Sequence, residues 1–117
     1  MYTSISYLIK VKSPEALQKA KELANEVTSP DAIDTRTMIA YPGGVERRET
    51  EHFRYGDFLE EVKIENENED SFELTFKIRP FEERPKPHTS YWKDLIVHTI
   101  MRIGKATGAT IEINRHQ

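Results

Sequence analysis

The fold is decided by residues 71–113, SFELTFKIRPFEERPKPHTSYWKDLIVHTIMRIGKATGATIEI. The first part of this stretch, residues 71–79, alternates between apolar and polar side chains. The apolar positions are Phe72, Leu74, Phe76 and Ile78, and the polar ones are Glu73, Thr75, Lys77 and Arg79. A period of two predicts a pleated strand with one buried face and one solvated face.

The second part of the stretch predicts a long amphipathic helix over residues 90–107. Its apolar side chains recur with the helical period and form one stripe, made of Trp92, Leu95, Ile96, Ile100, Ile103 and Ala106. Val97 and Met101 give the helix a second apolar side. Gly108 is the expected end of the helix, because glycine readily takes the left-handed conformation found there. A sheet face and a helix stripe of this kind cover one another.

The remaining elements follow from similar patterns. Strands are expected at residues 4–11, 34–41, 58–65 and 109–114, and Ser13-Pro14 begins a first helix as N-cap and first helical residue. Pro42-Gly43-Gly44 predicts a hairpin turn. Residues 45–55 fit either a solvated strand or an ordered loop, and residues 115–117 are expected to form a tail.

This order of elements predicts one α+β domain over residues 1–117. Strand–helix–strand units stand at both ends of the chain, with a hairpin region between them. Interleaving the strands of two such units gives a two-layer sandwich, with a mainly antiparallel sheet and two helices on one face. We therefore expect a ferredoxin-like topology with an inserted hairpin region. That topology hosts many unrelated functions, so it does not predict one.

Composition excludes several classes of function. The chain of 117 residues has a formal net charge of −3, which gives no overall attraction for nucleic acid or anionic membranes. It contains no cysteine, so disulfides, thiolate metal sites and cysteine nucleophiles are excluded. No segment approaches the roughly 20 apolar residues that a membrane helix needs. We expect a cytoplasmic protein with no membrane partner and no cofactor.

The most informative surface is the basic and aromatic segment at residues 47–55. Its candidate binding residues are Arg47, Arg48, His52, Arg54 and Tyr55. Arginine and aromatic side chains together bind phosphates, stack on bases or anchor protein interfaces. Glu49 and Glu51 lie among them, however, and ion pairing would turn the segment into a charged edge strand. Both interpretations remain open at this point.

No catalytic residues or metal ligands can be assigned from the sequence. The four histidines, His52, His88, His98 and His116, do not show the spacing of a metal site. We therefore expect a non-enzymatic interaction protein that associates with itself or another protein, through its helices or a sheet edge. The alternative is a module that binds an anion, a nucleotide or nucleic acid through residues 47–55. A third hypothesis is a small enzyme using His52 or His88 in acid–base chemistry.

Overall fold

The computed structural model describes residues 3–116, and the backbone alone at residues 115 and 116. Two short 3-10 turns, Pro42–Gly44 and Phe81–Glu83, interrupt the connections. The longer elements, in chain order, are β1 (Thr3–Lys10), α1 (Pro14–Glu26), β2 (Ile33–Ala40), β3 (Arg47–Arg54), α2 (Tyr55–Phe58), β4 (Leu59–Glu65), β5 (Ser71–Ile78), α3 (Tyr91–Thr107) and β6 (Thr110–His116). The chain is thus an α+β fold, as the sequence predicts.

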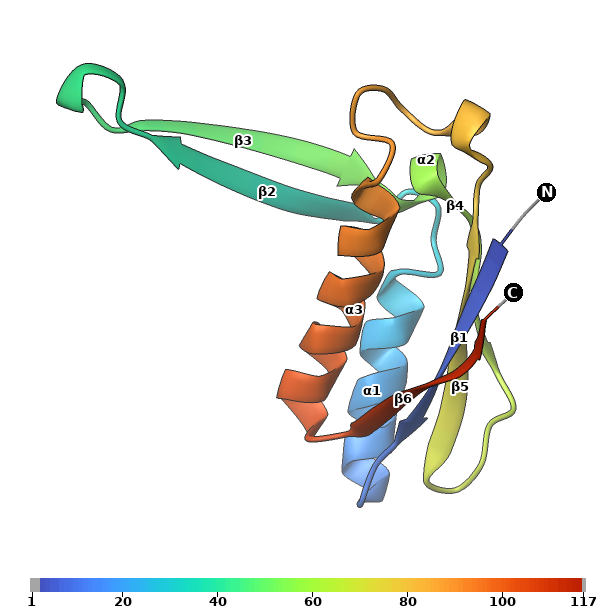
Figure 1. Ribbon diagram of the computed structural model, residues 1–117. Coiled ribbons are helices and arrows are strands. Elements are labelled where there is room, and N and C mark those ends of the chain that lie inside the picture. Colours follow the sequence, from blue (N-terminus) through green and yellow to red (C-terminus); the bar gives the residue numbers. More distant parts are fainter. Residues whose placement is uncertain (1–2, 117) are drawn as a thin grey trace.

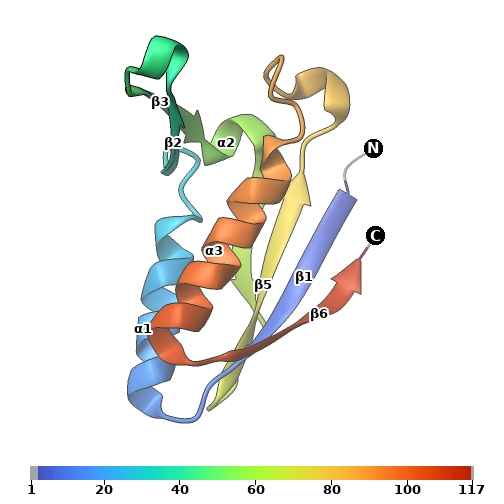
Figure 2. The ribbon, with the colours of Figure 1, turned by 60° about the vertical axis from the view of Figure 1, so that its left-hand side comes forward.

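Four strands form the main sheet, in the order β4-β5-β1-β6. All three pairings between neighbouring strands are antiparallel. The helices α1 and α3 lie side by side on one face of this sheet (Figures 1 and 2). Within the described residues, no helix has the length and apolarity to cross a membrane.

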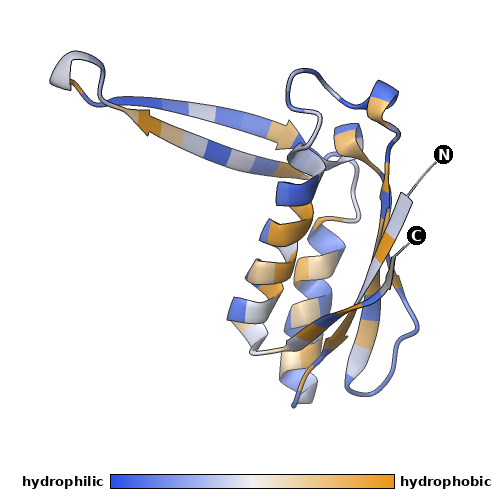
Figure 3. Cartoon of the chain, viewed as in Figure 1, coloured by the Kyte–Doolittle hydropathy of each residue, from blue (hydrophilic) through white to orange (hydrophobic). Residues whose placement is uncertain are grey.

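The core lies between this sheet and the two helices. The apolar side of β5 is buried as predicted, with Phe72, Leu74 and Phe76 fully enclosed. α1 contributes small side chains, Ala20 and Ala24, which allow it to approach the sheet closely. The hydropathy colouring shows apolar residues recurring along the helices and along the strands that they cover (Figure 3). Alternation with period two therefore predicts the inner face correctly.

The polar side of β5 is also buried, which corrects the expectation of a solvated face. Glu73 and Thr75 are 7% and 6% exposed. The Thr75 hydroxyl donates to Glu65 at 2.6 Å, and the Glu73 carboxylate accepts hydrogen bonds from Asn66 and Asn114. Polar side chains from the neighbouring strand β4, from the adjacent loop and from β6, which lies beyond β1, cover this side of β5. Hydrogen bonding satisfies the polar groups that this burial removes from water.

Several local predictions are confirmed and others need correction. Ser13 caps α1 through a hydrogen bond from the Ala16 amide at 3.1 Å, and Gly108 ends α3 in the left-handed conformation. Ala106, in the last turn of α3, is exposed rather than part of the buried stripe. The strand expected at residues 58–65 begins at Leu59 instead, because residues 55–58 form the helical turn α2. Residues 115 and 116 of the expected tail belong to β6, and residue 117 lies outside the described residues.

β2 and β3 form a separate two-stranded sheet, called here the arm. Their register runs from Ile33 opposite Arg54 to Ala40 opposite Arg47, which confirms the predicted hairpin. Gly43 and Gly44 have φ angles of 63° and 80° in the turn, a conformation that favours glycine. The arm projects away from the main sheet beside the first turn of α3 (Figure 1). Residues 47–54 are therefore a strand, but one that lies outside the main sheet.

Candidate functional site

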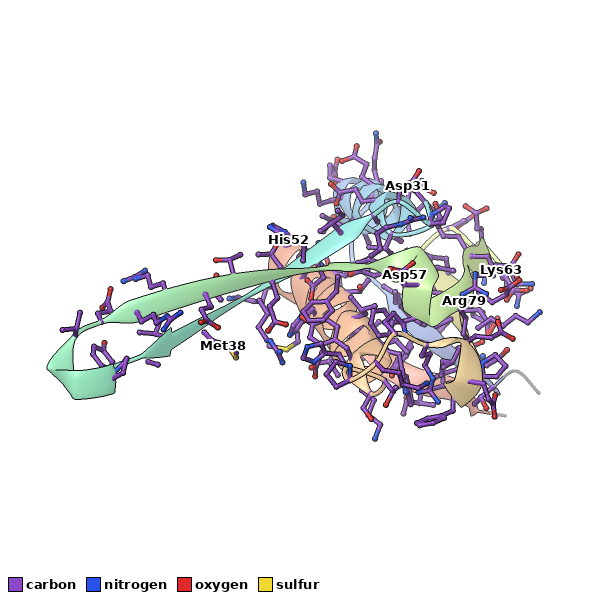
Figure 4. The ribbon with its side chains drawn as sticks, turned by 90° about the horizontal axis from the view of Figure 1, so that it is seen from above. Asp31, Met38, His52, Asp57, Lys63 and Arg79 are labelled. Carbon is purple, nitrogen blue, oxygen red and sulfur yellow. The ribbon has the colours of Figure 1, made fainter. Side chains whose placement is uncertain are left out.

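The residues that the sequence marks as a binding surface do not share one face of the arm. Because side chains alternate along β3, Arg48, His52 and Arg54 lie on one face and Arg47 lies on the other. Met38 shares the face of Arg47, and Figure 4 shows Met38 and His52 on opposite sides of the arm. The predicted site is thus split between two surfaces.

Each of the three arginines of the predicted site has a carboxylate close by. The pairs are Arg47 Nε with Glu49 Oε1 at 3.4 Å, Arg48 Nε with Glu46 Oε2 at 2.7 Å, and Arg54 Nη2 with Asp31 Oδ1 at 3.1 Å. All are largely exposed, and such pairs contribute only about 0.2–1 kcal/mol each to stability. They still compensate the positive charge that an anion would otherwise meet. This arrangement favours the charged edge strand over an anion site.

Tyr55 lies in the core rather than on the arm. It is 2% exposed, its hydroxyl is 2.8 Å from Thr99 Oγ1, and it accepts a longer hydrogen bond from Arg102 at 3.4 Å. Burial raises the pKa of the Tyr55 phenol above its usual value. The chain changes from strand to helical turn at this residue, and the change of period directs the side chain inward. Tyr55 therefore contributes to packing between α2 and α3.

A group of residues at the base of the arm joins it to α3. This base cluster consists of Asp34, Arg36, Glu51, Phe53, His88, Tyr91 and His98. The Tyr91 hydroxyl donates to Asp34 Oδ2 at 2.8 Å, and His98 Nδ1 lies 2.8 Å from the same oxygen. Burial raises the pKa of the Tyr91 hydroxyl, and the hydrogen bond to Asp34 raises it further. Asp34 thereby links β2 to two residues of α3 that lie about two helical turns apart.

Arg36 joins the aromatic and acidic halves of the base cluster. Its Nη2 donates to Glu51 Oε1 at 2.7 Å, and its guanidinium lies over the rings of Phe53 and Tyr91, 5.4 and 5.5 Å from their centroids. His88 Nε2 lies 3.0 Å from the other oxygen of Glu51. The hydrogen bond from Arg36 is the main cause that lowers the pKa of Glu51. The carboxylate is therefore held in its ionised form.

The contacts of the base cluster hold the arm against α3. A carboxylate beside an imidazole, as in Asp34 and His98, can orient the ring and hold a proton. Nucleophilic catalysis also needs a hydroxyl or thiol within hydrogen-bond reach of the imidazole. In the part of the chain that the structure describes, no hydroxyl side chain is hydrogen bonded to His88 or His98. The geometry fixes the angle between the arm and α3.

The outer half of the arm, residues 37–50, is the free half. Its side-chain hydrogen bonds and ion pairs all join residues of the arm itself, among the residues described. Several large apolar side chains are exposed along it, namely Met38 at 44%, Ile39 at 48%, Tyr41 at 64% and Val45 at 68%. Exposed apolar side chains gathered on one projecting element are typical of an interaction site.

A second basic and aromatic group lies where the connector before α3 meets the first turn of that helix. The Arg84 guanidinium is 5.5 Å from the Phe81 ring centroid and 5.9 Å from that of Trp92. Lys86 Nζ lies 4.2 Å from the Phe81 centroid, and Lys93 Nζ lies 5.6 Å from that of Trp92. Within residues 3–116, none of these three cations forms a salt bridge. The sequence analysis does not single out this connector cluster.

Searches for similarity find no matching protein-family model, curated protein or solved structure. Among the described residues, no group of three or more His, Cys, Asp or Glu side chains could hold a metal ion. The candidate site is therefore defined by its own geometry, as a projecting arm with a free outer half and a rigid base.

Proposed function

We propose that this chain is a non-enzymatic interaction protein that associates with itself, and that the arm is its main contact element. We further propose that the main sheet and its helices form a ferredoxin-like two-layer sandwich, into which the arm is inserted. The strand order β4-β5-β1-β6 supports this topology, because it interleaves two strand–helix–strand units. The cytoplasm is the proposed compartment, since a chain without cysteine suits a reducing environment.

The observation that carries the proposal is the free half of the arm. A two-stranded hairpin is marginally stable in water on its own, and usually needs a further strand or a packed face. Residues 37–50 have neither within the described chain, yet they expose four large apolar side chains. Contact with another molecule would supply the missing layer. A second copy is the simplest partner, because every arm then meets the same surface in a closed symmetric dimer.

Sedimentation equilibrium with an arm-shortened variant tests this proposal. Thr37 and Thr50 are cross-strand partners, so joining them through Asn-Gly removes residues 38–49 and keeps the base cluster. We expect the wild type to dimerise and the shortened variant to dimerise at least about tenfold more weakly, with similar melting temperatures at concentrations where both proteins are monomeric. A monomeric wild type would refute the proposal of self-association. An equally tight shortened dimer would show that the arm is not the contact element.

Anion binding is the second candidate function, and the connector cluster is the observation that favours it. Arg84, Lys86 and Lys93 carry charges without a described carboxylate partner, and the rings of Phe81 and Trp92 lie beside them. A triple Glu substitution at Arg84, Lys86 and Lys93 should then remove salt-dependent binding of single-stranded oligonucleotides. The same substitution at Arg47, Arg48 and Arg54 serves as the control. If only the variant at Arg47, Arg48 and Arg54 loses binding, the anion site lies in residues 47–55 and not in the connector cluster.

A further inference from the structure

One side of α3 is directed away from the core. Asp94, Val97, Met101 and Lys105 follow one another at intervals of three, four and four residues and form a single stripe. The opposite side of the helix carries Leu95, Thr99 and Ile103, which are buried. Val97 and Met101 are 49% and 56% exposed. Neither Asp94 nor Lys105 forms a salt bridge within residues 3–116.

The stripe is complementary to itself under two-fold symmetry. Two antiparallel copies of α3, related by an axis that crosses the exposed stripe at the level of Thr99 along the helix, would bring each Asp94 opposite Lys105 of the other copy. The same axis brings each Val97 opposite Met101 of the other copy, so charged and apolar positions match in one register. A parallel arrangement would instead place Asp94 against Asp94 and Lys105 against Lys105. The order acidic, apolar, apolar, basic therefore selects both a second copy and an antiparallel direction.

We infer that α3 forms the centre of a symmetric dimer, in which the stripe Asp94–Val97–Met101–Lys105 packs antiparallel against the same stripe of a second copy. The inference rests on the proposed self-association and names the surface that receives the partner. A pair of helices alone covers less than the roughly 800 Å² per partner of a standard interface. The free half of each arm adds the remaining area. The dimer thus uses two elements that expose large apolar side chains, the arm and α3.

Charge reversal at the two ends of the stripe tests this register. Asp94→Lys gives a stripe with two basic ends, and Lys105→Asp gives one with two acidic ends. Each variant alone should place like charges opposite each other twice, because of the two-fold axis. We expect each to dimerise about tenfold or more weakly than the wild type in sedimentation experiments. An equimolar mixture should recover the wild-type affinity to within about threefold, as a heterodimer in which both contacts are attractive.

Lys19→Asp on α1 is the matched control for Lys105→Asp, because it makes the same change of charge at an exposed position outside the stripe. It should dimerise like the wild type, and all variants should keep a cooperative thermal melt. Should a reversed variant fail to fold, Asp94→Asn and Lys105→Gln carry the same test. Each should then weaken dimerisation about threefold, and their mixture should recover part of the loss because one attractive contact returns.

The outcomes separate this inference from the proposed function. A wild type that stays monomeric up to about 1 mM would overturn both. A dimeric wild type whose reversed variants dimerise equally well alone would overturn the α3 register and leave self-association through the arm in place. Reversed variants that are monomeric alone and also when mixed would equally overturn the register. The α3 register is supported if each reversed variant dimerises weakly by itself and the equimolar mixture recovers the wild-type affinity.

Discussion

Phe53 on β3 and Tyr91 on α3 stack face to face, with ring centroids 3.6 Å apart and ring planes 15° from parallel. This contact joins two segments that are far apart in the sequence and belong to different layers of the molecule. It sets the direction of the arm, because the ring of Phe53 is held against the first turn of the helix. The hydrogen bond from Tyr91 to Asp34 adds a second point of attachment on the neighbouring strand.

Tyr91→Phe and Tyr91→Leu should separate the two contributions of this residue. Tyr91→Phe removes the hydrogen bond to Asp34 and should cost about 0.5–1.5 kcal/mol of unfolding free energy. Tyr91→Leu also removes the stacked ring and should cost about 0.5–1.5 kcal/mol more. Hydrogen exchange of the β2 and β3 amides should accelerate in the same order. Tyr41→Phe at the exposed end of the arm is the control, and an equal loss there would contradict the role of Tyr91 in holding the arm against α3.

The lowered pKa of Glu51 predicts how the stability contributed by the base cluster falls at acid pH. A group whose pKa falls below its unfolded value of about 4.3 contributes stability above that pH, and the contribution is lost as the pH falls through the lowered pKa. Arg36 is the principal cause, so Arg36→Gln should move the pKa of Glu51 back up. A carboxyl-carbon NMR titration of Glu51 in both proteins measures the change. Identical titration curves would show that Arg36 does not hold the carboxylate.

Glu73→Ala should be clearly destabilising although glutamate is usually a surface residue. The buried carboxylate accepts hydrogen bonds from Asn66 and Asn114, and its removal loses both of these charge-assisted bonds. We expect a loss of about 1–3 kcal/mol in urea unfolding. Glu112→Ala, at an exposed position on β6, should change stability by less than about 0.5 kcal/mol. Equal effects would mean that the outer side of β5 is solvated after all.

Two glycine-to-alanine substitutions should change the stability of the protein in opposite directions. A Cβ atom at Gly56 would lie 2.7 Å from the Pro30 carbonyl oxygen and 2.8 Å from Pro30 Cβ, so Gly56→Ala should cost about 1–3 kcal/mol. A Cβ atom at Gly104 would meet only Ile111 Cδ1 at 3.8 Å, an ordinary contact. Gly104→Ala should therefore stabilise α3 by about 0.5–1 kcal/mol. Thermal melts compare the two, and destabilisation at both positions would contradict the difference in space around these two glycines.

The sequence predicts the elements well because their patterns are local. The inner face of β5 and the buried stripe of α3 follow from periods that the backbone itself imposes. The burial of Glu73 could not be predicted in this way, since it depends on Asn66 in the loop and Asn114 on β6, which are brought to Glu73 only by the sheet order. Similarly, Pro42-Gly43-Gly44 predicts a hairpin, but no local signal states that the hairpin leaves the main sheet.

The candidate site was harder to predict because its contacts join distant parts of the chain. Asp34 and His98 meet across 64 residues, and neither forms a recognisable motif with its sequence neighbours. Tyr55 continues the alternation of β3 in the sequence, but the helical turn that begins there carries it into the core. The strongest signal present was the alternation of Arg47, Glu49 and Glu51, which places unlike charges on one face and anticipates their pairing.

The arm also bears on how this protein behaves at high concentration. Within the described chain, each strand of the arm has one backbone edge with no strand beside it. Charged side chains along β3 discourage another strand from pairing with its edge. On the β2 side, residues 37–41 form an uncharged run, Thr-Met-Ile-Ala-Tyr. Fibrils nucleate at uncharged runs of this kind when strand edges of successive molecules pair with one another and the assembly does not close. If the proposed dimer covers that edge, dimerisation would also protect the protein from aggregation, and conditions that weaken the dimer would then favour fibrillar precipitation.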